Sequence, residues 1–150
     1  MEEQNVNQTQ QNAAQETQIN QSSTQYGGFW IRFVAYLLDS LIVGLPLGLI
    51  TLFLTSLTQI GVFDYLSYIL IAVYFIYFEG TTGQTLGKKI VGVKVVDENG
   101  KIIGIPNAIL RYIGKILSAI ILLIGYIMAG FHPQKQALHD IIAKTYVIKV

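Results

Sequence analysis

The chain contains no cysteine, and charged residues make up only 13% of its 150 residues. The missing cysteines exclude disulfide bonds, thiol catalysis and cysteine-ligated metals. About a quarter of the residues of a soluble domain are charged, so the scarcity of charge points away from that class. With 52% hydrophobic residues, the composition predicts a one-domain membrane protein with little room for an enzyme outside the bilayer. We therefore expect no enzymatic activity, no cofactor and no bound metal.

Positive charge is also sparse, and it is divided unevenly along the chain. Residues 1–25 carry a net charge of −3 from Glu2, Glu3 and Glu16, while residues 26–150 carry +4. This excess is spread too thinly for a nucleic-acid-binding stripe, and membrane proteins keep such charge on their cytoplasmic face. The expected partner is the lipid bilayer, not nucleic acid.

The segment 1–25 is polar and almost free of apolar side chains. It contains eight Gln and four Asn, a composition that predicts a disordered tail. Because the chain begins Met1-Glu2-Glu3 and lacks a basic start with an apolar core, the segment does not resemble a signal peptide.

Three apolar segments follow, at about 33–57, 62–78 and 109–131. The first includes most of an uncharged run of 24 residues at 40–63, and about 20 residues cross the hydrocarbon of a bilayer. Pro46 lies inside this run and predicts a kink. The second segment carries tyrosines near both ends, as interfacial rings often lie. These two segments are expected to span the membrane.

The third apolar segment is ambiguous. Arg111 and Lys115 lie four residues apart on one face of a helix, so residues 107–117 form an amphipathic pattern. If that helix lies in the membrane interface, about fourteen apolar residues remain, a length typical of a re-entrant segment. Residues 109–131 therefore form either a third span or a re-entrant region.

The basic residues predict the orientation. Residues 55–63 contain no Lys or Arg, whereas residues 79–115 contain six. The positive-inside rule then places 79–115 and the N-terminus in the cytoplasm of a multi-pass protein of the cell membrane.

A small β element is expected on the cytoplasmic side. The stretch IVGVKVVDENGKIIGI, residues 90–105, alternates around Asn99-Gly100, a dipeptide suited to a two-residue turn, and predicts a β-hairpin. Residues 84–96 and 136–148 also resemble each other at an offset of 52. This echo suggests that the C-terminal segment is a further strand, giving a three-stranded element beside a mainly α-helical transmembrane bundle.

Several separated motifs resemble those of the RDD family of bacterial membrane proteins. They are FWIRFVAYLLD at 29–39, GQTLGKKIVGVKVVDENG at 83–100, Arg111 at the next helix, and LHDIIAKT at 138–145. The resemblance covers residues 26–150. One departure is Lys144, which stands where a glycine is common, and it is expected to alter the final turn.

The family takes its name from one Arg and two Asp, and the resemblance places these at Arg32, Asp39 and Asp140. Arg32 and Asp39 are seven residues apart, so about 10 Å of helix axis separates them and each needs another partner. Asp39 lies inside the apolar boundary, where an unpaired carboxylate costs several kcal/mol.

Supporting partners for these three residues come from the rest of the chain. The candidates are Lys88, Lys89, Arg111 and His139.

Two functions remain open at this point. Some RDD members are regarded as cation/proton exchangers, which implies that the Arg/Asp/Asp cluster alternates between a proton and a small monovalent cation, with a homo-oligomer or membrane-protein partner completing the path. The alternative is a non-catalytic membrane scaffold or accessory protein that binds a protein partner through its β element. For the cluster itself, the scarcity of polar side chains in the two spans favours a structural clamp over an ion site. Between the two functions the sequence favours neither, because the resemblance supports exchange and the sparse polar lining opposes it.

Overall fold

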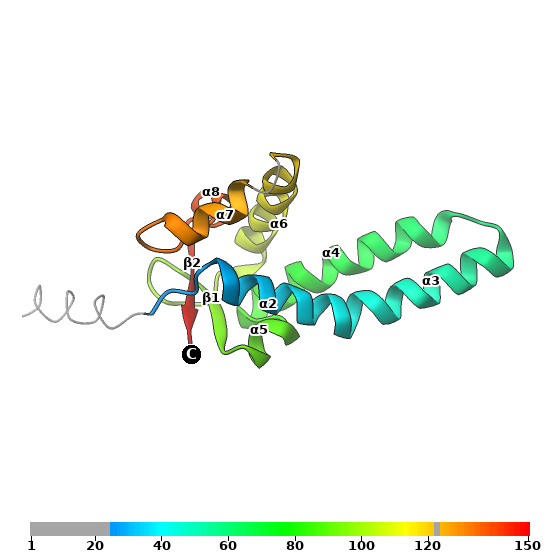
Figure 1. Cartoon of the computed structure of the whole chain (residues 1–150), viewed down its shortest axis with the longest axis horizontal. Helices are drawn as coiled ribbons and strands as arrows, with labels where there is room; N and C mark the ends of the chain where they lie inside the picture. Colours follow the sequence, from blue (N-terminus) through cyan, green and yellow to red (C-terminus); the bar gives the residue numbers. More distant parts are fainter. Residues whose placement is uncertain (1–24, 122–123) are drawn as a thin grey trace, which may run out of the picture.

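A computed structural model describes residues 25–121 and 124–150 of the chain. The tail predicted for residues 1–25 lies, apart from Gln25, outside the described residues. The described part is mainly helical, with one small sheet (Figure 1). Its elements are α2 (Phe29–Asp39), η1 (Ser40–Gly44), α3 (Leu45–Thr58), α4 (Val62–Thr82), α5 (Leu86–Ile90), β1 (Val93–Asp97), α6 (Gly104–Ile120), α7 (Ile124–Phe131), α8 (Leu138–Ile142) and β2 (Thr145–Lys149).

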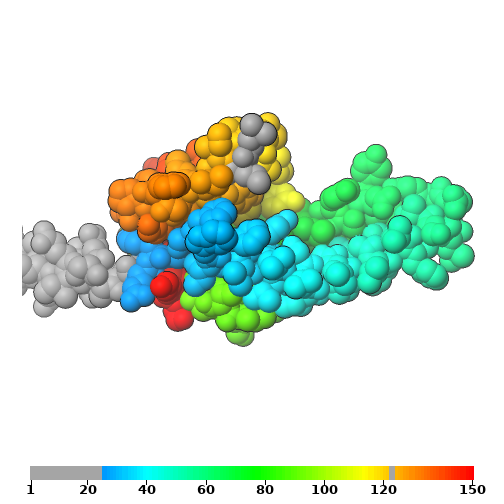
Figure 2. All heavy atoms as spheres, viewed as in Figure 1, coloured from blue at the N-terminus to red at the C-terminus, as the bar shows by residue number. Residues whose placement is uncertain are grey.

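A long helical hairpin dominates the shape. Helices α2, η1 and α3 form one continuous helix of 30 residues, Phe29–Thr58, and α4 has 21 residues. At 1.5 Å per residue they are about 45 Å and about 30 Å long, enough for the hydrocarbon core of a bilayer. Both are apolar enough to span a membrane, and almost none of their residues are buried within the chain. Figures 1 and 2 show α3 and α4 projecting side by side as an arm, away from the other elements.

The hydrogen-bond pattern of the long helix changes just before Pro46. Residues Ser40–Gly44 form a π-helical turn, in which the backbone N–H of Leu45 donates to the carbonyl of Ser40. Proline has no N–H to donate, so one carbonyl of the preceding turn loses its helical partner. Where the sequence predicts a kink, the structure has a widened turn, a feature that often marks functional sites.

The third apolar region is bent. Helices α6 and α7 meet at 103°, with residues 122–123 between them outside the described part. Helix α6 begins at Gly104, five residues before the predicted segment. It buries Ala108, Arg111, Gly114 and Ser118, so its polar face points into the protein and its apolar face points outward.

The sheet differs from the predicted hairpin. Strand β1 pairs with β2 in antiparallel register, with Val95 opposite Val147 at the centre. The segment after Asn99-Gly100 does not return as a strand, so the prediction of a hairpin over 90–105 is wrong, as is the three-stranded element. The suggestion that the C-terminal segment forms a strand of the same sheet is confirmed.

The outer edge of β1 explains why no hairpin forms. A tight turn is present, since the N–H of Asp97 donates to the carbonyl of Lys101 at 2.9 Å. The next outward-facing N–H, that of Val95, donates instead to the carbonyl of Gly83 at 2.7 Å. The chain leaves the sheet after Asp97 and enters α6 at Gly104. The loop after α4 therefore takes the place of a returning strand.

The echo between residues 84–96 and 136–148 is a repeat of structure. Helix α5 with β1 and helix α8 with β2 are each a five-residue helix followed by a five-residue strand. The Gln84 side chain donates to the carbonyl of Val93, and Gln136 donates to that of Thr145, both at 2.9 Å. The two units pair through β1 and β2 about an approximate twofold axis at Val95 and Val147.

The backbone follows the same repeat. Left-handed φ angles occur at Gly83 (73°) and Gly92 (68°) of the first unit, and at the equivalent Lys135 (51°) and Lys144 (50°) of the second. The final turn that Lys144 was expected to alter is therefore kept, although a side chain in this conformation costs about 1–2 kcal/mol.

We predict that Lys144→Gly stabilises the protein by about 0.5–1 kcal/mol. Relief of left-handed strain exceeds the roughly 0.4–1 kcal/mol that glycine costs through the entropy of the unfolded chain. The thermal unfolding temperature of the detergent-solubilised protein would then rise by about 1–4 °C. The reciprocal change, Gly92→Lys, is expected to lower the unfolding temperature, because a Cβ there would lie 3.0 Å from the carbonyl oxygen of Val150. An unchanged or lower temperature for Lys144→Gly would contradict this account.

Candidate functional site

Asp140 lies between two arginines from different helices. It is fully buried in α8, and its carboxylate accepts hydrogen bonds from Arg32 of α2 and Arg111 of α6. The backbone N–H of Ala137 donates to the same carboxylate at 3.0 Å. Arg32 also donates to the carbonyls of Gly27 (2.7 Å) and Lys135 (2.6 Å), so all its nitrogens are satisfied. Asp140 thereby joins α2, α6 and α8 at one point.

Glu79, in the last turn of α4, is the second buried carboxylate. Its oxygens accept from Lys88, from Lys115 at 2.6 Å and from Nε of Arg111 at 3.0 Å. Arg111 thus bridges Glu79 and Asp140, and it also donates to the hydroxyl of Thr145. The result is one network from α2 through α8, α6 and α4 to α5.

This network carries more positive than negative charge. Four cationic side chains share two carboxylates, so neither carboxylate is free to take up a further cation. Removing one partner from a buried ion pair typically costs about 3–5 kcal/mol, because the other charge is left uncompensated. The network is therefore suited to holding helices together.

Asp39 occupies a different environment. It is buried, and all of its hydrogen-bond donors are neutral: the Tyr74 hydroxyl at 2.8 Å, the Thr85 hydroxyl at 2.6 Å and the Gly87 N–H at 2.7 Å. Within the residues that the structure describes, Asp39 has no ion-pair partner. It is the last residue of α2, directly before the π turn.

The close approach of α5 to α2 requires Gly87. A Cβ at this position would lie 2.1 Å from the carbonyl oxygen of Ala35 and 2.9 Å from the carboxyl carbon of Asp39. Only glycine lets its N–H reach the carboxylate of Asp39 at this distance. This local packing explains why α5 presents its first turn to Asp39.

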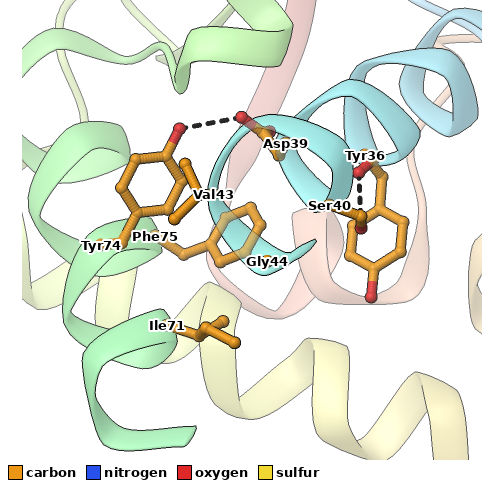
Figure 3. Close-up of a pocket in the computed structure, with 8 residues that line it drawn as sticks. All are labelled: Tyr36, Asp39, Ser40, Val43, Gly44, Ile71, Tyr74 and Phe75. Carbon is orange, nitrogen blue, oxygen red and sulfur yellow. Dashed lines mark hydrogen bonds between the residues drawn. The ribbon is translucent and has the colours of Figure 1, made fainter. Parts of the chain in front are cut away.

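A small cavity of about 70 Å³ adjoins the Asp39 carboxylate. In Figure 3 the Tyr74 hydroxyl points to Asp39, while the Ser40 hydroxyl is bonded to the backbone carbonyl of Tyr36. The remaining walls are apolar. The lining residues are Tyr36, Asp39, Ser40, Val43, Gly44, Ile71, Tyr74 and Phe75.

Phe75 separates this cavity from the ion-pair network. Its ring lines the cavity, and the ammonium of Lys115 lies 4.8 Å from the ring centroid. Lys88 lies 6.0 Å from the same centroid. The two lysines are thus held on a cation–π surface next to the cavity that contains Asp39.

Titration of the C-terminal groups follows from their surroundings. Burial opposes ionisation of Asp140, but the charges of Arg111 and Arg32 outweigh it and hold the pKa of Asp140 well below its usual range. Burial lowers the pKa of His139 to about 3, so its imidazole is neutral at physiological pH. His139 lies 3.5 Å from Asp140 and adds no charge to the network there.

The predicted residues are only partly brought together. Arg32, Arg111 and Asp140 meet, with His139 beside them, whereas Lys88 contacts Glu79. Lys89 is exposed. Asp39 binds neutral donors and not Arg32 or any of the proposed cationic partners, so the single cluster of one Arg and two Asp is two neighbouring sites.

Glu79, Tyr74 and Thr85 were missed from the sequence. Glu79 directly follows the apolar segment predicted for 62–78 and falls in the stretch 79–115 predicted to be cytoplasmic, although α4 continues to Thr82. Glu79 is a single carboxylate at the end of an apolar run, and six basic residues follow it within 79–115. This pattern could have indicated that Glu79 is the partner of some of those basic residues. Tyr74 was assigned to the membrane interface, and no sequence signal pointed to Thr85.

Two helices able to span a bilayer and a buried polar network at one end of them define an integral membrane protein. The chain matches the RDD family over residues 26–144 and belongs to that family.

Relatives of similar length occur in Bacillus subtilis (strain 168). The protein YxaI is 38% identical over 145 residues, covering 81% of this chain and 95% of the relative. The membrane protein YteJ is 37% identical over 134 residues, covering 82% and 80%. The protein YckC is 34% identical over 126 residues, covering 80% and 82%. No solved structure matches the chain.

We predict that Asp140→Asn lowers the free energy of unfolding by about 3–5 kcal/mol at pH 7, because Arg32 and Arg111 lose their shared counter-charge. The pKa of Asp140 is lower in the folded than in the unfolded chain. Its stabilisation is therefore complete above about pH 4 and is lost as the pH falls further. Unfolding of the detergent-solubilised proteins should differ most at neutral pH and converge in acid.

Glu98→Gln is the matched control, since Glu98 is exposed in the turn after β1. This variant should unfold within about 0.5 kcal/mol of the parent at every pH. Equal stability of Asp140→Asn and the parent at pH 7 would contradict the role assigned to the network.

Proposed function

We propose that the protein exchanges a small monovalent cation for a proton across the cell membrane, with Asp39 as the group that binds them alternately. The single observation that carries this proposal is the environment of Asp39. It is a buried carboxylate within a membrane helix, bonded only to neutral donors and adjoining a cavity. An ionisable residue inside a membrane span is a functional candidate by default.

The chemistry near Asp39 supports a hard cation. Oxygen atoms are the ligands such ions prefer, and the cavity offers the Asp39 carboxylate with the hydroxyls of Ser40 and Tyr74. The helix that carries Asp39 is irregular at this point, with the π turn at Ser40–Gly44 directly after Asp39 and Pro46 shortly beyond it. Broken or irregular helices at a binding site are a recurring arrangement in transporters.

Charge balance supports the choice of Asp39 over the other carboxylates. Asp140 and Glu79 are saturated by arginines and lysines, so in our proposal they hold the scaffold and take no part in binding the ion. One hairpin cannot enclose a path for ions, so the proposal requires a homo-oligomer or a membrane-protein partner.

The alternative, a scaffold that binds a protein through its β element, has less support. A partner strand would need a free edge of the sheet. The edge of β2 is occupied by the segment before α2, where the N–H of Gly27 donates to Val147 and that of Lys149 to Gln25, both at 2.8 Å. The edge of β1 is occupied by Gly83.

We also propose that the protein is multi-pass, with both termini in the cytoplasm. The bonds between Arg32 and Asp140 and between β1 and β2 keep the start of α2 and the C-terminal segment together. The basic residues of 79–115 favour the cytoplasm for that end, while the turn between α3 and α4 would lie outside.

Exchange is tested with purified protein in vesicles that contain a pH-sensitive dye. An inward gradient of sodium or potassium should alkalinise the interior of vesicles with the parent protein, because each cation that enters expels a proton. Asp39→Asn should abolish this ion-driven pH change while the variant still inserts and elutes as the parent does.

Asp64→Asn is the control for exchange, because Asp64 is an exposed carboxylate in the first turn of α4, at the opposite end of the hairpin. It should exchange ions at the parental rate. A pH change undiminished in Asp39→Asn, or absent from the parent protein, would overturn the proposal.

Orientation is tested separately with reporters. A reporter that is active only in the cytoplasm should give a signal when fused after Val150, and a reporter that is active only outside should not. An extracytoplasmic signal at Val150 would refute the proposed topology without bearing on ion exchange.

A further inference from the structure

The structural repeat extends beyond the helix–strand units. The segment WIRFVAYLLD of α2, residues 30–39, resembles ILRYIGKILS of α6, residues 109–118, at an offset of 79. In this alignment Arg32 corresponds to Arg111, and both bind Asp140. Asp39 corresponds to Ser118.

The helices of the two halves also make corresponding contacts. In the first unit, Gly87 of α5 packs against Ala35 of α2. In the second, His139 of α8 packs against Gly114 of α6, the equivalents of Gly87 and Ala35. Helix α4 contacts α6, and the corresponding helices α7 and α2 contact each other. The second half of the chain is therefore a copy of the first, with α6 and α7 in the places of α2–α3 and α4.

The two copies of the helical hairpin differ in length. At the offset of 52 that relates the two helix–strand units, Tyr74 corresponds to Tyr126. Tyr74 lies 42 positions after Arg32, whereas Tyr126 lies only 15 positions after Arg111. The second hairpin therefore has 27 fewer residues than the first. Shared between its two arms at 1.5 Å per residue, this loss shortens each arm by about 20 Å, whereas the hydrocarbon core is about 30 Å thick. The second hairpin is therefore too short to cross the bilayer and return.

Both ends of the short hairpin lie on the same side. Arg111 of α6 is bonded to Glu79 and Asp140. At the other end, the loop after α7 is held at Lys135, whose carbonyl accepts from Arg32. The chain therefore enters and leaves the α6–α7 hairpin at the buried network.

The outer surface of this hairpin is apolar. Residues 116–131 contain no charged side chain. Large aliphatic side chains are exposed along both helices, on the side away from the network. They include Ile113, Ile116, Ile120, Ile121, Ile124 and Ile127.

We infer that α6 and α7 form a half-membrane hairpin whose outer surface contacts the acyl chains of one leaflet, that on the side of the network. The hairpin descends from the network, turns near Ile121 within that leaflet, and returns to the same face. Lipid is the partner because the equivalent surface of the first hairpin is the membrane-spanning part of the chain, and the lost length corresponds to the far leaflet. This inference does not depend on ion exchange at Asp39.

The absence of cysteine from the chain permits a direct test with single-cysteine variants of the full-length protein in membranes. Ile121→Cys reports on the turn of the short hairpin, Ile60→Cys on the turn of the long hairpin, and Glu98→Cys on the surface beyond β1; all three side chains are exposed. A membrane-impermeant maleimide is applied to right-side-out and inside-out vesicles. A nitroxide at each introduced thiol then reports depth through its collisions with oxygen and with a nickel chelate.

We expect Ile60→Cys and Glu98→Cys to react from opposite faces and Ile121→Cys to react from neither. The nitroxide at position 121 should lie between the bilayer midplane and the polar boundary on the side of position 98, at most about 15 Å below that boundary. Ile124→Cys, one turn further along the hairpin, should be equally protected and serves if the first variant folds poorly.

Three results would overturn the inference. Reaction of Ile121→Cys from the face that labels Ile60→Cys would indicate a third full span. Reaction from the opposite face, as fast as that of Glu98→Cys, would place the hairpin in water. A nitroxide depth beyond the midplane would exclude confinement to one leaflet.

Discussion

The ion pairs of Asp140 with Arg32 and Arg111 hold this structure together. They join the first membrane helix to the C-terminal segment, two regions far apart in the chain. A buried carboxylate is stable only with such partners, and each arginine in turn needs the carboxylate, because an uncompensated buried charge costs several kcal/mol. The packing of α8 on α6 and α2 depends on this arrangement, since Asp140 of α8 binds an arginine from each. Arg111 also donates to Thr145 at the start of β2, which links the network to the sheet.

The duplication explains the architecture and also separates support from function. Each half contributes one arginine to Asp140, one glutamine that ties a loop to the following strand, and one strand to the sheet. The halves differ at the position of Asp39, which is Ser118 in the second half, where His139 also replaces Gly87. The first of the two equivalent places carries an acidic group beside a cavity, and the proposed ion site lies there.

The limits of sequence interpretation are clearest at the sheet and at Glu79. Asn99-Gly100 does form a turn, but a hairpin also needs a free edge, and Gly83, directly after α4, occupies it. Alternation of apolar residues does not show whether the N–H groups of a strand will bond to the next strand or to a carbonyl of another segment. The role of Glu79 depended on how far α4 continues past its apolar run, because one further turn moves this carboxylate from a loop into a buried network of three cations. By contrast, the weak echo between 84–96 and 136–148 correctly predicted the second strand. Segments that adopt the same turns and strand at equivalent positions favour similar residues there.

The sequence alone determined that this is a membrane protein of the RDD type, with two apolar helices long enough to cross a bilayer and a C-terminal strand. The membrane class and the two long helices follow from composition and from the lengths of uncharged runs, which act locally. The RDD type follows from the resemblance of several separated motifs, and the C-terminal strand from the echo between residues 84–96 and 136–148. Tertiary structure decided that Asp140 is shared by two arginines, that Asp39 has neutral donors instead, and that the third apolar region bends back toward the network. Such pairings depend on which distant groups meet in space, since a buried charge is satisfied by whichever partner the packed helices bring within hydrogen-bonding distance.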